Sequence, residues 1–469
     1  MRNPIRIAVV GGGIAGLAAA LRLRDQAPEG ARITVYEQSA AVGGKLRTGA
    51  LAGSTVELGA EAFLVGDGTG VGESPAVALA RRVGLADALV HPEPVGAAIA
   101  VDGTLRAIPG GTLLGVPGNL DLVAPLARPA AERDRDGGRP VLGPDEDVAV
   151  GELVRRRLGD EVVDRLVDPI LGGVYAGRAD RLSLVATAPG LAAACRAEHT
   201  LTGAVRAALA AAPRPPGTPV FATVAGGVSR LVEAVVAAAG AQVRLGLPVR
   251  ELASRGAGWR LAVGSRRDPR EEEADAVVLA VPARPAARLL VATDPDAAAD
   301  VGVLDYASVA LVTLALPGAA LPELSGFLIP ASEGTAVKAA TFFDRKWAHL
   351  RRDDGVTLVR ASVGRHGEEA VLRSTDGDLA TTVHGELSRL VGPLPAPVDA
   401  VVQRWGGALP QYAPGHVDRV RRVRAVLRAG HPRLALAGAA YDGVGIAACV
   451  RSGEAAAEEI IKALGESFV

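Results

Sequence analysis

Three glycines near the start of the chain have the spacing of a chemically useful motif. Gly11, Gly13 and Gly16 form a G-x-G-x-x-G pattern between an apolar segment at 5–10 and an Ala- and Leu-rich segment at 14–24. In a strand–turn–helix unit these glycines permit a tight turn, close approach of the backbone to a pyrophosphate, and close packing of helix on strand. The pattern therefore predicts a dinucleotide site, although a chain with 58 glycines also produces such patterns by chance.

A carboxylate follows at the distance that such a site requires. Residues 32–36 are expected to form a second strand, which ends at Glu37. An acid about 20 residues after the glycines hydrogen-bonds a ribose 2′-hydroxyl. Because this carboxylate would repel a 2′-phosphate, it disfavours NADP and leaves FAD or NAD. A signal peptide is the rival interpretation of the apolar start, but the segment lacks an extended basic region and a cleavage site.

Two further glycine segments could contact the same ligand. Gly43 and Gly44 precede basic residues, so this loop either holds a pyrophosphate with its amides and Arg47 or is an ordinary turn with a solvated arginine. Near the end, a strand at 434–437, a glycine turn from Gly438 and a helix at 447–464 repeat the opening arrangement. A second helix N-terminus would then point at the same ligand.

Composition excludes several other classes of function. The 51 basic and 52 acidic residues nearly cancel, so no overall field attracts nucleic acid. Cys195 and Cys449 lack disulfide or metal spacing, which suits a reducing cytoplasm and small core residues. The seven histidines form no metal-binding pattern. No apolar run reaches about 18 residues without Pro, Gly or charge, which leaves at most peripheral membrane contact.

The remaining elements suggest two further regions. Apolar spacing predicts helices over 148–171 and 188–212. Strands are expected at 243–252 and 275–282, with an acidic hairpin loop at 266–273. Segments 309–316, 326–330 and 358–363 are expected to form a separate antiparallel sheet.

Taken in order, the motifs resemble those of FAD-dependent oxidoreductases related to amine oxidases and phytoene desaturases. The segments that carry this resemblance are 11–16, Glu37, 43–48, 57–63, 221–231, 243–249, 275–282 and 438–453. Within that group, segments 173–177, 346–349, 409–412, 415–416 and 441–446 look like the porphyrinogen oxidases of haem biosynthesis. The resemblance covers most of the chain.

The resemblance implies a fold that is α/β and α+β. It has a Rossmann-like FAD-binding domain (1–70, 218–290 and 430–469), an interleaved antiparallel-sheet substrate domain (90–110 and 291–429) and a helical insertion (111–217). FAD would be bound without a covalent link. The residues implied to bind it are Gly11, Gly13, Ile14, Ala15, Gly16, Glu37, Gly43, Gly44, Lys45, Arg47, Gly59, Ala60, Glu61, Val249, Gly438, Val444, Gly445 and Ile446.

The resemblance also implies the reaction, in which the flavin rather than a protein nucleophile performs the chemistry. Relatives that oxidise protoporphyrinogen often carry a basic residue after Leu-Gly-Pro, whereas this chain has Glu61 after Leu58-Gly59-Ala60. In this respect it looks like the soluble Gram-positive type, which oxidises coproporphyrinogen III with molecular oxygen and forms hydrogen peroxide. Protoporphyrinogen IX, another amine oxidase or desaturase activity, and a flavin-free protein that binds lipidated partners are the alternatives. The implied setting is cytoplasmic, with transient contact to the next haem-pathway enzyme.

The substrate would lie between the antiparallel sheet and the helices. Candidate pocket residues are Tyr175, Phe327, Lys338, Phe342 and Arg345, with plain core positions as the alternative for the aromatic ones. Arg178, Arg181 and Lys346 are further candidates for binding propionates, or else solvated surface residues.

Overall fold

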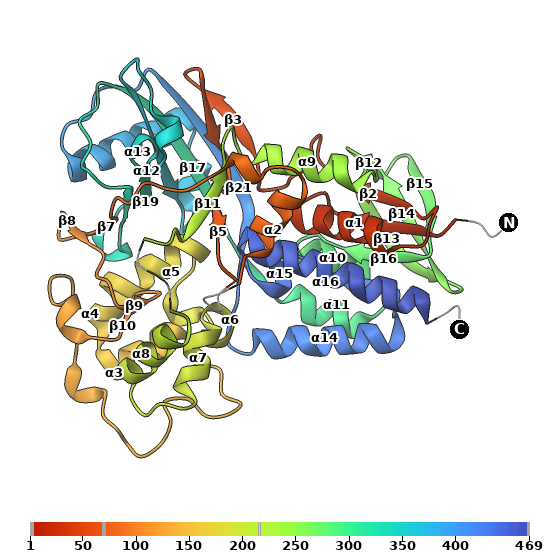
Figure 1. Cartoon of the computed structure of the whole chain (residues 1–469), viewed down its shortest axis with the longest axis horizontal. Coiled ribbons are helices and arrows are strands. Elements are labelled where there is room, and N and C mark those ends of the chain that lie inside the picture. Colours follow the sequence, from red (N-terminus) through yellow and green to blue (C-terminus); the bar gives the residue numbers. More distant parts are fainter. Residues whose placement is uncertain (1–3, 68–71, 214, 216, 467–469) are drawn as a thin grey trace.

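The computed structural model describes residues 4–67, 72–213, 215 and 217–466. Three regions are visible in Figure 1: a part that carries both termini, an antiparallel sheet with α13 (Asp376–Val391), and a group of helices beside that sheet. The predicted domain limits at residues 1, 70 and 469 lie outside the described residues.

A parallel sheet forms the centre of the part with the two termini. Its spatial order is β12 (Gln242–Arg244), β2 (Arg32–Tyr36), β1 (Arg6–Val10), β16 (Ala276–Leu279) and β22 (Leu434–Leu436). In chain order these are the third, second, first, fourth and fifth strands of the sheet, which is the doubly wound arrangement. The order reverses between β1 and β16, and ligands of such sheets bind at the carboxyl ends of the strands at this switch point.

Both faces of the parallel sheet are covered. Helices α1 (Ile14–Gln26), α9 (Ser229–Ala239) and α16 (Ile446–Gly465) pack on one face. The other face packs on β13 (Val249–Arg255), β14 (Gly258–Gly264), α10 (Ala283–Leu290), α11 (Pro295–Gly302) and α14 (His416–Gly430). Burial on two faces explains why the central strands β1, β16 and β22 are nearly continuous apolar runs.

A larger, mostly antiparallel sheet adjoins this unit. Its order is β21 (Asp399–Gln411), β17 (Asp305–Pro317), β20 (Val356–Val363), β19 (Val337–Phe342), β18 (Gly326–Leu328), β7 (Ala98–Val101) and β8 (Thr104–Ala107). The pair β18–β7 is parallel. Leu379, Val383 and Leu387 of α13 pack on one face of this sheet. The segments predicted to form a separate antiparallel sheet thus share one sheet with the β7–β8 hairpin, which lies within the predicted substrate-domain segment 90–110.

The helical region contains the elements between residues 150 and 211. They are α3 (Val150–Leu158), α4 (Asp160–Val162), a π-helical turn (Val163–Val167), α5 (Asp168–Tyr175), α6 (Leu184–Thr187), α7 (Pro189–Cys195) and α8 (Leu201–Ala211). The single helix predicted over 148–171 is wrong, because Gly159 has φ +89° and ends α3. The block predicted over 188–212 is two helices, since Thr200 caps a new helix by accepting a hydrogen bond from the N–H of Gly203.

Two strand predictions also need correction. The strand predicted over 243–252 is divided between β12 and β13, which belong to different sheets, because the chain turns at Gly246 (φ +66°). The acidic loop predicted at 266–273 is largely strand β15 (Pro269–Ala274), paired with β14. Its Glu271 lies 2.9 Å from Arg260 on that neighbouring strand, so cross-strand ion pairing accommodates the acidic run.

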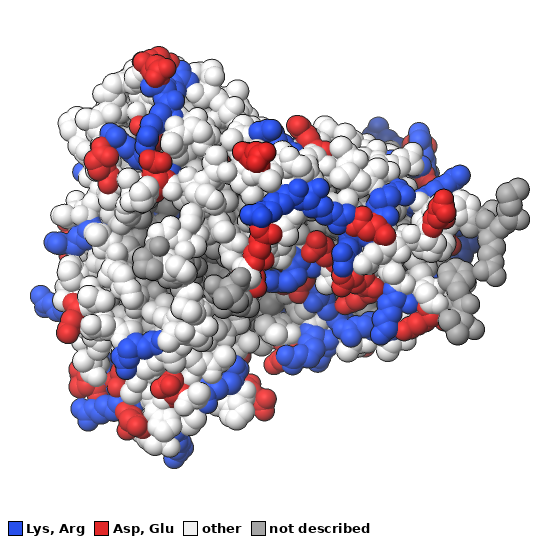
Figure 2. Space-filling model, in the orientation of Figure 1, with Lys and Arg blue, Asp and Glu red and all other residues white. Residues whose placement is uncertain are grey.

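Short elements connect these regions. They are β3 (Thr48–Leu51), β4 (Ser54–Glu57), β5 (Phe63–Leu64), α2 (Pro75–Arg82), β6 (Leu89–Val90), β9 (Thr112–Leu113), β10 (Val116–Pro117), β11 (Phe221–Val224), α12 (Phe343–Lys346) and α15 (Ala439–Asp442). Among the described residues, no helix is both long and apolar enough to cross a bilayer. Charges of both signs are interspersed on the face shown in Figure 2, as their near-equal numbers imply.

Candidate active site

The glycine turn lies at the switch point of the parallel sheet. A Cβ atom on Gly11 would lie 2.4 Å from the carbonyl oxygen of Ala280, and one on Gly16 would lie 2.0 Å from that of Gly11. These two positions therefore require glycine for packing within the protein. Gly13 differs, because a Cβ atom there would have no neighbour within 4 Å. The space beside Gly13 is open, as expected where a cofactor approaches the backbone.

Glu37 lies directly against this turn. Its Oε2 accepts a hydrogen bond from the N–H of Gly12 at 2.8 Å, and its Oε1 accepts from the N–H and Oγ of Ser39 at 2.8 and 2.7 Å. The backbone oxygen of Glu37 accepts from the N–H of Leu247, two residues before Val249, at 3.0 Å. A carboxylate has about four lone-pair sites and three are used here, so Glu37 retains an acceptor site on Oε2 for a ribose hydroxyl.

We expect Glu37→Ala to weaken cofactor binding without abolishing it. Loss of a hydrogen bond to a charged group costs about 1.5 to 3 kcal/mol, which is roughly a 10- to 100-fold weaker affinity. Titration of the stripped protein with flavin dinucleotide measures the change. Glu29→Ala is a matched control, because Glu29 is exposed. Equal affinities in the two variants would contradict a contact between Glu37 and the cofactor.

The loop at 43–47 packs beside the glycine turn. The N–H of Gly43 donates to the carbonyl oxygen of Gly12 at 2.7 Å. The same loop also contacts the segment at 59–60. The N–H of Ala60 donates to the carbonyl oxygen of Lys45 at 2.9 Å, and a Cβ atom on Gly59 would lie 2.0 Å from that oxygen. The two segments predicted to bind the cofactor are therefore in contact with each other.

Lys45 is suited to an anionic ligand. Burial lowers the pKa of Lys45, and the nearby Cys449 thiol offsets this only in part. Within the described residues no carboxylate forms an ion pair with it. A phosphate or another anionic group of a cofactor would supply the missing partner.

The C-terminal turn meets the same edge of the sheet. Gly445 is the N-cap of α16, and a Cβ atom on Gly445 would have no neighbour within 4 Å. Helices α1 and α16 pack closely because Gly453 has no side chain: a Cβ atom there would lie 2.0 Å from the carbonyl oxygen of Ala15. Since both helices follow parallel strands of one sheet, their N-termini lie at the same edge. Val444 and Ile446 flank this glycine, so these predicted cofactor residues lie at the N-terminus of α16.

A polar network holds the C-terminal turn in place. The N–H of Gly438 donates to Ser452 Oγ at 2.8 Å, and Ser452 Oγ donates in turn to Asp442. Asp442 also pairs with Arg424, at 2.6 Å. Asp442, Ser452 and Arg424 were not predicted as site residues, although Ser452 is adjacent to Gly453, which packs against α1. Open space at Gly13 and Gly445, the unpaired Lys45 and two helix N-termini together fit an anionic dinucleotide cofactor.

Arg47 and Trp405 connect the cofactor loop to the antiparallel sheet. The guanidinium carbon of Arg47 lies 5.7 Å from the centre of the Trp405 ring, and Trp405 Nε1 donates to the carbonyl oxygen of Leu58 at 2.7 Å. Trp405 was not predicted as a site residue. It stands four residues before the motif at 409–412, so proximity to that motif is the only signal that could have found it.

Glu61 has partners on the antiparallel sheet and on the adjoining α12 segment. Its Oε1 accepts from Lys346 Nζ at 2.5 Å and from Trp347 Nε1 at 3.1 Å, and its Oε2 pairs with Arg360. Burial alone would raise the pKa of Glu61, but the charges of Arg360 and Lys346 lower it to about 2. Glu61 therefore fastens the loop at 57–61 to the sheet, and Lys346 is not free to bind a propionate.

One face of the antiparallel sheet is half-buried rather than packed in a core. Cross-strand pairing places Thr341 opposite Arg360, and Ala339 and Leu311 opposite Ser362; all of these residues are partly exposed. Trp405 is on β21 beside them. Because these side chains are neither core nor fully solvated, this face is the natural wall for a ligand above the cofactor loops.

Phe327 and Phe342 belong to the opposite face. They are 2% and 1% exposed, their rings meet edge to face at 5.8 Å, and both pack in the core with α13. The structure therefore places both phenylalanines as core residues, which was the alternative to a pocket role. Strand alternation accounts for this, because residues 327 and 342 point away from the partly exposed side of the sheet.

The other predicted pocket residues separate into two places. Tyr175 lies at the end of α5, buried edge-on against Tyr412 with 5.8 Å between ring centres, and Lys338 on β19 donates to the carbonyl oxygen of Gly172 at 3.3 Å. Both therefore lie where α5 meets the sheet. Arg345, on α12, pairs with Glu323 at 2.9 Å, so the structure does not bring it together with Lys338.

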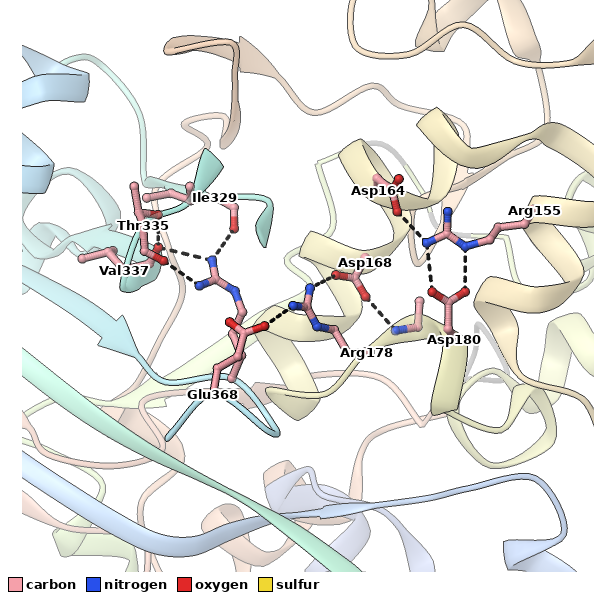
Figure 3. A network of polar contacts seen from close by, with 11 residues as sticks. Arg155, Asp164, Asp168, Arg178, Asp180, Ile329, Thr335, Val337 and Glu368 are labelled. Atoms are coloured by element: carbon pink, nitrogen blue, oxygen red, sulfur yellow. Dashed lines mark hydrogen bonds and ion pairs between the residues drawn. The ribbon is translucent and has the colours of Figure 1, made fainter. Parts of the chain in front are cut away.

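Arg178 links the helical region to the sheet. Figure 3 shows its guanidinium between Asp168 of α5, at 3.3 Å, and Glu368, which follows β20. In the same network Arg155 pairs with Asp164 and Asp180, at 2.5 and 2.9 Å. These pairs occupy Arg178, whereas Arg181 is exposed. The two cysteines, Cys195 and Cys449, are buried, and burial raises the pKa of each thiol to about 12 and about 11.

Comparison with known proteins agrees with this geometry. The family described as flavin containing amine oxidoreductase matches residues 14–461. Coproporphyrinogen III oxidase of Mycobacterium tuberculosis is 39% identical over 98% of each chain, and that of Bacillus subtilis is 30% identical over 97% of each. A crystal structure from Exiguobacterium sp. 255-15, provisionally named a protoporphyrinogen oxidase, is 31% identical, with a TM-score of 0.83 over 98% of this chain and 99% of that one.

The chain therefore belongs to the family of flavin-containing amine oxidoreductases. Among its relatives are coproporphyrinogen III oxidases that match along their full length. The predicted family and the predicted mixed fold are confirmed. A flavin is the cofactor that this family uses, and the open glycine turns fit it.

Proposed function

We propose that this protein oxidises coproporphyrinogen III to coproporphyrin III in haem biosynthesis, with FAD as its cofactor and molecular oxygen as the final oxidant. The observation that carries the proposal is the full-length match to coproporphyrinogen III oxidases, which spans the glycine turns and the half-buried sheet face. Glu37 supports FAD over a 2′-phosphorylated dinucleotide. The reaction suits the cytoplasm, with at most peripheral contact to a membrane.

Held by the two glycine turns and Lys45, FAD would supply hydride-accepting chemistry at N5 toward a bridging carbon of the porphyrinogen, with oxygen as the final oxidant and hydrogen peroxide as the by-product. Porphyrinogen and porphyrin differ by six hydrogens, so three oxygen molecules are consumed and three peroxide molecules form. The protein's own groups orient the reactants: the two glycine turns and Lys45 hold the cofactor, and the sheet face with Trp405 excludes water.

The test of the function uses the purified protein with coproporphyrinogen III and protoporphyrinogen IX under air. We expect porphyrin fluorescence to appear with the first substrate, together with about three peroxide molecules per porphyrin. Acid precipitation should release FAD, identified by chromatography. Protoporphyrinogen IX oxidation is the second candidate, favoured by the name of the Exiguobacterium structure. Turnover of that substrate alone would replace the first proposal with the second.

The electron donor gives a separate prediction. The sequence contains one complete dinucleotide fingerprint, and FAD would occupy it. Anaerobic addition of NADPH or NADH should therefore leave the visible absorbance of the oxidised flavin essentially unchanged. Dithionite provides the positive control for reduction. Rapid bleaching by NADPH would contradict the assignment of the porphyrinogen as the electron donor in turnover.

A further inference from the structure

Lys338 is a buried cation for which the described residues provide no carboxylate. The residue is 6% exposed, and its ammonium group donates to the carbonyl oxygen of Gly172 at 3.3 Å. A neutral carbonyl compensates only part of the cost of removing an ammonium group from water. Buried lysines are otherwise paired with an acid or serve a ligand.

The other basic candidates for binding the substrate differ from Lys338. Arg178 pairs with Asp168 and Glu368. Lys346 pairs with Glu61, and Arg345 with Glu323. Each of these three basic residues therefore has an acidic partner. Lys338 is the buried candidate for which the described residues supply none.

The surroundings of Lys338 add positive charge. Burial, together with the charges of Arg365 and Arg360, lowers the pKa of Lys338 to about 7. Arg365 is itself 8% exposed and donates to the backbone oxygens of Ile329, Thr335 and Val337, the three carbonyl groups on the left of Figure 3. An anion placed at Lys338 would therefore gain from more than one cation.

Lys338 lies beside the half-buried sheet face that we propose as the substrate wall. Helix α5 approaches the half-buried side of the sheet, because a Cβ atom on Gly173 would lie 3.2 Å from Cδ2 of Leu328, and Leu328 pairs with Ala339 on that side. The register of β19 against β20 shifts between Val337 and Ala339, and Lys338 lies within this irregularity. Its ammonium group contacts Gly172 on α5. Next to Gly173, the side chain of Val174 is 45% exposed.

We propose that Lys338 binds a carboxylate of the substrate at the junction of α5 and β19. This inference rests on the proposed function, because coproporphyrinogen III supplies four propionates. The macrocycle lies along the half-buried sheet face and the exposed apolar surface at Val174, and one propionate reaches the ammonium group between Gly172 and β19. A charge-assisted hydrogen bond to the propionate replaces the weaker one to the Gly172 carbonyl.

The experiment compares Lys338→Met with the wild-type protein, both full-length and loaded with flavin. The probes are coproporphyrin III, which is the stable oxidised form of the substrate, and its tetramethyl ester, and fluorescence titration gives both dissociation constants. We expect the variant to bind the acid at least tenfold more weakly and the ester with unchanged affinity. Lys462→Met is the matched control, because Lys462 lies on α16 with its side chain 78% exposed.

Thermal unfolding without porphyrin separates this role from a structural one. Removing a buried charge that lacks an acid should leave the melting temperature of the Lys338→Met protein equal to or above that of the wild type. A structural lysine would instead lower it when replaced. Lys338→Gln provides the same comparison if the methionine variant does not fold.

The outcomes separate this inference from the proposed function. Unchanged binding of the acid in both Lys338 variants, or equal loss of acid and ester, overturns the role of Lys338 while wild-type turnover of coproporphyrinogen III still supports the function. Failure of wild-type turnover overturns the function. A Lys338-dependent preference for acid over ester would in that case still support a carboxylate site.

Discussion

A Gly13→Val protein is expected to fold normally and to be purified without flavin. The backbone at Gly13 is extended, with φ −73° and ψ 172°, which valine readily adopts. A Cβ atom at this position has no neighbour within 4 Å, so the apoprotein has room for the new side chain. The pyrophosphate of the cofactor would occupy that room, so the valine side chain and the bound cofactor cannot be present together. We expect at least a 100-fold loss of flavin affinity with little change in the unfolding free energy.

Gly16→Val provides the matched contrast. Its Cβ atom would lie 2.0 Å from the carbonyl oxygen of Gly11, so helix α1 could not pack on β1. Here we expect loss of soluble protein or destabilisation by more than about 3 kcal/mol, since overpacking of a core typically costs 1 to 3 kcal/mol and the clash is with backbone. Flavin content, circular dichroism and urea unfolding measure the two effects. A Gly13→Val protein that retains flavin would show that the open space is not the cofactor site.

The contrast between these glycines shows what the sequence could predict. The succession of strand, glycine turn, helix and acid predicts a doubly wound sheet, because each of these elements has a strong local sequence pattern. From the sequence, the motif assigns Gly13 to the approach of a pyrophosphate and Gly16 to helix packing, but it does not show what Gly11 packs against. That partner is the carbonyl group of Ala280, which lies more than 260 residues from Gly11 along the chain.

The substrate side was less predictable for a related reason. Phe327 and Phe342 are large, apolar and near basic residues, but the face of a strand depends on its register and on irregularities such as the shift at Val337–Ala339. Arg360 was not predicted as a site residue, because its partner Glu61 is 299 residues away. Helix boundaries near Gly159 and Thr200 failed for a local reason, since periodicity continues across a turn that one glycine or one cap creates.

Glu61→Gln is expected to cost about 3 kcal/mol of stability at neutral pH, because it leaves the partly exposed Arg360 and Lys346 without their buried counter-charge. This is the lower end of the roughly 3 to 5 kcal/mol that breaking a fully buried pair costs. The pKa of Glu61 is lowered to about 2 by these two cations, despite the opposing effect of burial. A lowered carboxyl pKa contributes stability that is complete above the unfolded value of 4.5 and is lost as the pH falls through about 2. The difference between variant and wild type should therefore be constant from pH 8 to pH 5 and shrink below that.

Glu57→Gln, four residues earlier, should behave in the opposite way. Burial raises the pKa of Glu57 to about 7, although hydrogen bonds from the N–H of Val228 at 2.8 Å and from Thr48 at 3.1 Å favour its charged form. A raised carboxyl pKa contributes stability that is present below 4.5 and lost as the pH rises through about 7, so the neutral glutamine should be harmless at pH 5 and stabilising at pH 8. Urea unfolding of both variants at pH 5 and pH 8 measures this. Similar losses of unfolding free energy in Glu57→Gln and Glu61→Gln at pH 8 would contradict these different roles. Glu61 is the counter-charge that holds the cofactor loop to the sheet, whereas Glu57 is destabilised by its charge.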